Sequence, residues 1–116
     1  MELNKLYEIL QKSWCKETCY ELLQDEWTKE NSALGQCFVM ALVVNDFFGG
    51  EILKGKVSDN TSHYWNLIDG RGVDFTKSQF SKENKVISKP IKVSRESLKE
   101  IDRYLLLKSK VQNLTF

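Results

Sequence analysis

The sequence is poor in the features that mark linkers, membrane spans and disulfide frameworks. One proline and six glycines occur in 116 residues, with no repeat or low-complexity stretch, so we predict a single domain over residues 1–116. No apolar run is long enough to cross a membrane, and the first residues lack the basic and apolar regions of a signal peptide. Three cysteines, an odd number, argue against a disulfide framework and favour a reducing compartment. We therefore expect a cytoplasmic protein.

The chain also lacks a strong excess of charge of either sign. Its net charge of +1 gives no reason to expect a nucleic acid, a membrane or an acidic substrate as partner. The charge is uneven, because residues 1–80 carry 8 Lys/Arg against 12 Asp/Glu, whereas residues 81–116 carry 9 against 4. We interpret the basic C-terminal part as a solvated helix face, with a phosphate-binding patch as the alternative. The oligomeric state stays open.

The hydrophobic spacing predicts helices first. Residues 2–13 form an amphipathic pattern, and a second helical pattern runs over residues 19–27 with Thr18 as its N-cap. Residues 28–32 are polar and indicate a loop. An apolar run from Phe38 to Val44 predicts a buried central helix that begins near Cys37 and stops at Gly49-Gly50.

The spacing then changes to that of strands. Strands are predicted around residues 52–57, 63–68 and 73–76, with turns at 59–61 and 69–72. Residues 79–80 follow the third strand and precede a polar loop. Short apolar pieces at 86–87 and 91–93, around Pro90, suit an edge strand. Ser94 is a plausible N-cap of a last helix whose core face holds Leu98, Ile101 and Leu105, while Leu106-Leu107 could contact a partner. The predicted class is α+β, with the central helix on an antiparallel sheet of three or four strands.

A cysteine, the single histidine and a carboxylate form a candidate catalytic group. Gly35 allows a tight turn, after which Cys37 lies in the first helical turn, where unpaired N–H groups and the helix dipole favour a thiolate. His63 opens a strand that should lie against this helix. If the hairpin turn at 69–70 has two residues, Asp74 is a diagonal neighbour of His63 on the same face, with Cβ atoms about 7–8 Å apart. A three-residue turn would place the two side chains on opposite faces.

These side chains suit nucleophilic catalysis. We assign Cys37 as the nucleophile, His63 as the general base and Asp74 as the acid that orients the imidazole, with no metal or organic cofactor. The Cys37 N–H is one oxyanion donor. The second donor is left open among the side chains of Gln36, Trp14 and Asn31. Two further residues of the histidine strand are expected to line the substrate, Trp65 and Asn66.

Two sets of motifs resemble known families. Gly35-Gln36-Cys37-Phe38-Val39 resembles the nucleophile motif of transglutaminase-like proteins, and His63-x-Trp65-Asn66 with Val73-Asp74-x-Thr76 resembles their histidine and aspartate strands. The wider pattern is similar to the small bacterial YunG-like family: Trp14, Trp27, Leu34-Gly35-Gln36-Cys37, Phe48-Gly49-Gly50, His63-Tyr64-Trp65-Asn66, Val73-Asp74-Phe75-Thr76 and Gln79-Phe80.

The resemblance implies a papain-like core and a Cys-His-Asp arrangement without naming a substrate. The chain lacks the accessory domains and calcium-binding segments of full transglutaminases. We therefore expect hydrolysis or acyl transfer on an amide, isopeptide or thioester, carried by a small molecule or a protein, rather than protein cross-linking.

Two alternatives remain open. The first is a non-catalytic protein-binding domain that keeps the fold, and an inaccessible Cys37 would favour it. The second is a zinc-binding domain in which Cys15, Cys19, Cys37 and His63 supply four ligands. In that case Cys15 and Cys19, four residues apart, would share one helix face; otherwise they are core or interface residues.

Overall fold

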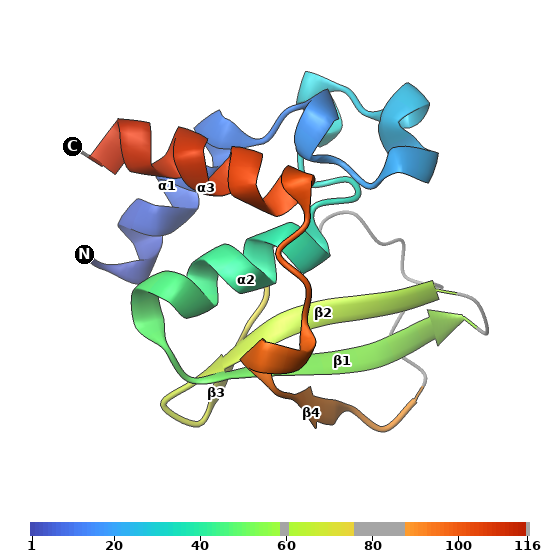
Figure 1. Ribbon diagram of the computed structural model, residues 1–116, viewed down its shortest axis with the longest axis vertical. Helices are drawn as coiled ribbons and strands as arrows, with labels where there is room; N and C mark the ends of the chain where they lie inside the picture. The colour runs from blue at the N-terminus through green and yellow to red at the C-terminus, as the bar shows by residue number, and fades with distance from the viewer. Residues whose placement is uncertain (59–60, 76–87, 116) are drawn as a thin grey trace.

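The computed structural model describes residues 1–58, 61–75 and 88–115. A layer of helices covers one face of an antiparallel sheet, and α2 lies between the sheet and the other two helices (Figure 1). The α-helices are α1 (Leu3–Ser13), α2 (Cys37–Phe48) and α3 (Asp102–Thr115). The strands are β1 (Glu51–Ser58), β2 (Thr61–Ile68), β3 (Arg71–Val73) and β4 (Ile91–Val93), in the order β3-β2-β1-β4. The predicted α+β class is confirmed at this level.

Helix α2 is the centre of the core. All six residues from Val39 to Val44 are buried, so the helix is covered on nearly every side, as its apolar run predicts. It ends at Gly49, whose N–H donates to the Asn45 carbonyl at 2.8 Å. The next residue, Gly50, has a φ of +77°, and a Cβ there would lie 2.3 Å from the Leu67 carbonyl oxygen. Glycine is therefore required where the chain leaves α2 and passes against β2.

Helix α3 packs against α2, and α1 packs against α3, so that each buries one face. The buried residues of α1 include Leu6, Ile9 and Leu10, and those of α3 are Tyr104, Leu107 and Val111. Each fully buried aliphatic side chain contributes roughly 1.5–3 kcal/mol to the free energy of folding. Within the described part of the chain, no helix combines the length and the apolar character that a membrane span requires.

The hairpin between β2 and β3 has the predicted two-residue turn. Ile68 pairs with Arg71 and Asn66 with Val73, and both turn residues have positive φ, 51° at Asp69 and 79° at Gly70. This is the backbone that an Asp-Gly pair favours in tight hairpins. Strand β3 ends at Val73, earlier than predicted, so Asp74 lies just beyond the ladder.

The predicted edge strand is confirmed over Ile91–Val93, which pairs with β1. The remaining predictions for the turn at 59–60, for Thr76, for 79–80 and for 86–87 fall outside the described residues.

The predicted helix over residues 19–27 is wrong. The chain instead forms short 3-10 turns at Lys16–Thr18, Glu21–Glu26 and Lys29–Asn31, and the side chain of Leu22 is 78% exposed. The Thr18 hydroxyl donates to the Cys15 carbonyl at 2.9 Å and accepts from the Cys15 N–H at 3.0 Å. It closes the preceding turn and is therefore not the cap of a following helix.

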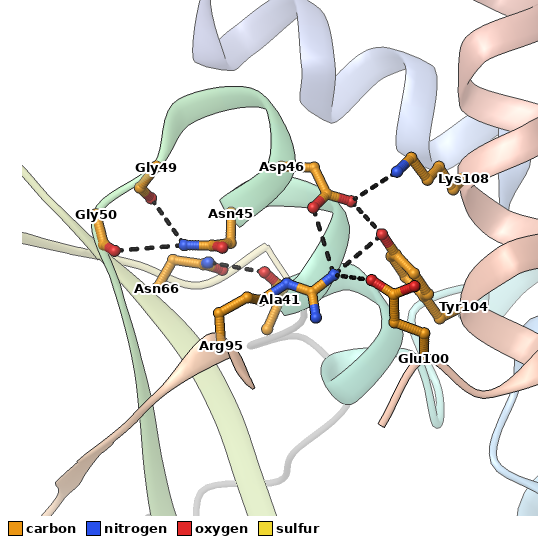
Figure 2. Close-up of polar contacts among 10 residues, drawn as sticks. All are labelled: Ala41, Asn45, Asp46, Gly49, Gly50, Asn66, Arg95, Glu100, Tyr104 and Lys108. Carbon is orange, nitrogen blue, oxygen red and sulfur yellow. Dashed lines mark hydrogen bonds and ion pairs between the residues drawn. The ribbon is translucent and has the colours of Figure 1, made fainter. Parts of the chain in front are cut away.

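The last helix also begins later than predicted. Ser94 precedes a 3-10 turn at Arg95–Ser97, and α3 starts only at Asp102. The predicted core face is wrong at Leu105, which is 48% exposed. Figure 2 shows what sets the observed face: the Tyr104 hydroxyl donates to the Asp46 carboxylate on α2. Arg95 and Lys108 lie 3.4 Å and 3.6 Å from the same carboxylate.

Candidate active site

A turn with a positive φ at Gly35 places Cys37 at the start of α2. Gly35 has a φ of +70°, and a Cβ there would lie 2.5 Å from the Cys19 sulfur. The Gly35 carbonyl accepts a hydrogen bond from the Tyr20 N–H at 2.9 Å, which holds the turn against residues 19–20. Cys37 is the first helical residue and is half-buried. Its N–H has no acceptor within the helix, because the first helical N–H groups lack a preceding turn.

His63 and Asp74 form a close polar pair. The His63 Nε2 atom lies 2.5 Å from the Asp74 Oδ2 atom, and the two side chains are 2% and 11% exposed. The geometry follows from the hairpin register, which sets Asp74 one step past the Asn66–Val73 pair and therefore diagonal to His63.

The third member of the group, Cys37, also reaches the imidazole. Burial opposes the charged form of His63, yet hydrogen bonds with Asp74 and with the Cys37 side chain raise the pKa of His63 from 6.5 to about 9. The ring is therefore held by a carboxylate and a thiol at once. The structure thus brings together the three residues assigned to catalysis, which come from a helix start, a strand and the segment after the next strand.

The two substrate-lining candidates on β2 have different positions. Trp65 stacks on the His63 ring, with centroids 5.6 Å apart and planes 20° apart, so it forms a wall beside the imidazole. Asn66 points to the opposite face of the sheet and is fully buried under α2. Its Nδ2 atom donates to the Ala41 carbonyl at 2.9 Å, as Figure 2 shows. Asn66 therefore joins β2 to α2 and does not line the substrate.

The three candidates for the second oxyanion donor also differ. Gln36 is fully buried, and its Nε2 atom donates to the Cys15 carbonyl at 3.2 Å. Asn31 is exposed on a 3-10 turn. Trp14 is 5% exposed, and its indole N–H has no acceptor among the described residues. Of the three, the Trp14 N–H is the donor that the described contacts leave available.

The other cysteines are not placed for the same chemistry. Cys19 is fully buried, its thiol donates to the Tyr20 carbonyl at 3.5 Å, and burial raises the pKa of Cys19 to about 11. Within residues 1–58, 61–75 and 88–115, no three His, Cys, Asp or Glu side chains form a group that could hold a metal ion. The four residues considered as zinc ligands are all described, and they do not form such a group.

Sequence reasoning missed an aromatic contact beside the site. Tyr7 on α1 stacks on Phe75, with centroids 4.7 Å apart, and meets Trp14 edge-on at 6.4 Å. Phe75 directly follows Asp74, so this contact holds the segment that carries the carboxylate against α1. The available signal was the spacing of seven residues between Tyr7 and Trp14, which places both on one helix face.

Comparison of the sequence with known proteins finds related chains. The model of a family described as "YunG protein" matches residues 2–115. The chain is similar to "Uncharacterized protein YunG" of Bacillus subtilis (strain 168), with 43% identity over 72 residues. That match covers 62% of this chain and 57% of the relative, so the chain spans little more than half of the relative's length. No solved structure matches the chain.

Proposed function

The chain belongs to the YunG family, and we propose that it is a cysteine-dependent hydrolase or acyltransferase with a papain- or transglutaminase-like core. The observation that carries the proposal is the environment of His63, whose ring contacts Asp74 at 2.5 Å and whose pKa is raised by the Asp74 and Cys37 side chains. The order of the three residues and their elements, helix then strand then strand end, is also that of the transglutaminase-like motifs. Amides, isopeptides and thioesters are the expected substrates.

The first step forms a thioester on the protein. Asp74 binds Nε2, so Nδ1 is the ring nitrogen that exchanges a proton with the Cys37 thiol. The resulting thiolate attacks the carbonyl carbon of the substrate, and a C–S bond forms as the carbonyl π bond opens to an oxyanion. When the carbonyl re-forms, the bond to the amine or thiol leaving group breaks, and the leaving group takes the proton from the imidazolium.

The second step releases the acyl group. Water, or an amine in the transfer reaction, gives a proton to the neutral His63 ring as it attacks the thioester carbonyl. The C–S bond then breaks, and Cys37 recovers its proton from His63. In both steps the oxyanion is stabilised by the Cys37 N–H at the helix start and by the indole N–H of Trp14.

Exposure favours this proposal over the binding-domain alternative. That alternative expects a Cys37 sealed from solvent, whereas Cys37, the first residue of α2, is half-buried. A thiol that is partly accessible and hydrogen-bonded to an imidazole is typical of reactive cysteines rather than of packing residues.

Alkylation with iodoacetamide near neutral pH tests the nucleophile, with the modified cysteines located by mass spectrometry. The chain carries its own controls: Cys15 is half-buried, and Cys19 is fully buried with a pKa of about 11. We expect Cys37 to react first, well ahead of Cys15 and of a free model thiol, and His63→Ala to remove this advantage. Equal rates for Cys37 and the model thiol, unchanged in His63→Ala, refute the catalytic assignment.

Acyl transfer is tested directly with p-nitrophenyl acetate. We expect a burst of nitrophenol and the mass of one acetyl group on Cys37, both absent in Cys37→Ser. In Asp74→Asn the thiol remains while the imidazole loses its charged partner, so acylation should slow rather than vanish. If Cys37→Ser acylates as fast as the natural chain, Cys37 is not the nucleophile.

A further inference from the structure

A hollow of about 470 Å³ lies between the end of α1, the 3-10 turns and α3, and Cys37, His63 and Asp74 are not among its lining residues. Two tryptophans, Trp14 and Trp27, line it. Trp27 is fixed there because its indole N–H donates to the Ser32 carbonyl at 3.0 Å. A larger hollow, about 580 Å³, lies at the other end of α2 near Asn45, and none of the predicted site residues lines it.

The hollow lined by Trp14 and Trp27 is strongly cationic. Four lysines line it against a single acidic residue, Glu17: they are Lys12, Lys16, Lys29 and Lys110. Lys16 has an ion pair with the exposed Asp25 at 4.0 Å, a separation and exposure at which pairs contribute little. Among the described residues, no carboxylate pairs with the other three. At neutral pH the hollow therefore holds several unneutralised ammonium groups.

Two sets of contacts join this hollow to the catalytic group. The carbonyl of Cys15, a lining residue, accepts a hydrogen bond from Gln36, which directly precedes Cys37. Trp14, another lining residue, meets Tyr7, and Tyr7 stacks on Phe75, which directly follows Asp74. The walls of the hollow are thus one or two contacts away from both the nucleophile and the orienting carboxylate.

From this geometry we infer that the substrate is an acidic acyl compound whose carboxylate or phosphate lies among the lysines while its carbonyl carbon meets Cys37. The inference rests on the proposed function and deepens it by naming the substrate class. The tryptophan rings cover the apolar part between the two ends. The indole N–H of Trp14, which has no acceptor among the described residues, then finds one in a substrate oxygen.

Anion binding is measured by calorimetry at low salt, with pyrophosphate and citrate as separate probes for phosphate and carboxylate. We compare Lys12→Gln/Lys29→Gln with Lys89→Gln/Lys99→Gln, which removes the same charge from exposed lysines outside the hollow. Since the first variant removes two lysine–anion pairs, we expect about tenfold weaker binding in it and no change in the second. Binding should weaken as salt is added.

Two further variants of the experiment separate this inference from the proposed function. Cys37→Ser should bind the anion as well as the natural chain, because it lacks only the nucleophile. In the natural chain, mono-p-nitrophenyl glutarate should acylate Cys37 about tenfold faster than p-nitrophenyl butyrate, and Lys12→Gln/Lys29→Gln should lose that preference.

The possible results distinguish the two ideas. Anion binding without any acylation supports the anion site but refutes the proposal that the chain is an enzyme. Acylation without a preference for the acidic ester, or without anion binding, refutes the acidic substrate class but agrees with the proposed catalytic function. An equal loss of binding in the two lysine variants shows attraction by net charge only, and it also overturns the inference.

Discussion

The titration of His63 is the sharpest test of the candidate site, because His63 is the only histidine in the chain. A single imidazole gives a single set of ring signals in a proton–carbon NMR spectrum, so its titration is read without assignment. We expect a midpoint near pH 9 rather than near 6.5. The cause is the pair of hydrogen bonds with Asp74 and Cys37, which favour imidazolium more than burial disfavours it.

The magnitude follows from the size of the pKa change. A rise from 6.5 to about 9 corresponds to about 3 kcal/mol in favour of the protonated ring. Because the pKa in the folded state is raised, this stabilisation is fully present below pH 6.5 and is lost as the pH rises through about 9. The free energy of unfolding should therefore fall between pH 6.5 and pH 9, by at most that amount.

Asp74→Asn is the matched perturbation. It keeps the size of the side chain and removes the charge, so the pKa of His63 should fall, since burial still disfavours imidazolium and only the Cys37 side chain is left to favour it. Urea unfolding should show the largest loss of stability near pH 6 and a much smaller loss above pH 9. A midpoint at or below 6.5 in the natural chain, unchanged in Asp74→Asn, would refute the reasoning from which the whole site is built.

Two further predictions concern the supports of the site. Gly35→Ala should destabilise the chain by about 2–3 kcal/mol more than Gly49→Ala, measured by urea unfolding: both glycines have a φ near +70°, but only at Gly35 would the Cβ clash, at 2.5 Å from the Cys19 sulfur. Equal losses of stability in the two variants would show that the positive φ alone, and not the contact with Cys19, sets the cost of each substitution. Tyr104→Phe should cost about 1–2 kcal/mol because the partly buried Asp46 and Arg95 side chains lose their hydroxyl partner, whereas Tyr20→Phe, at 43% exposure, should change little. Similar values for the two tyrosines would contradict the role of the Asp46 network.

The parts of the fold that the sequence predicts well are those with strong local signals. The apolar run of α2 and the two glycines after it predict that helix from the local sequence alone. The Asp69-Gly70 pair sets the hairpin register, and that register places Asp74 diagonal to His63. A local turn signal thus carries most of the prediction that two distant polar residues meet.

The parts that fail are held by tertiary contacts. The segment from Cys19 to Trp27 has a helical spacing of apolar residues, but it forms a 3-10 turn at Glu21–Glu26 because distant groups satisfy the backbone around it. The Tyr20 N–H donates to Gly35, and the Thr18 carbonyl accepts from Arg103 on α3 at 3.1 Å. Periodicity cannot predict such bonds, because their partners lie far away in the chain.

The clustering of charge could not be predicted from the sequence either, because it also depends on tertiary contacts, and it bears on the proposed function. A net charge of +1 gave no reason to expect an acidic substrate, since 17 basic and 16 acidic residues nearly cancel. Yet Lys12, Lys16 and Lys29 come from the part of the chain with an excess of acidic residues, and Lys110 joins them only because α3 folds back over α1 (Figure 1). A substrate responds to the charges within about a Debye length, about 8 Å at physiological salt, and not to the sum over the chain. The lysine-lined hollow is therefore a property of the fold, which is why the net charge of the chain does not predict it.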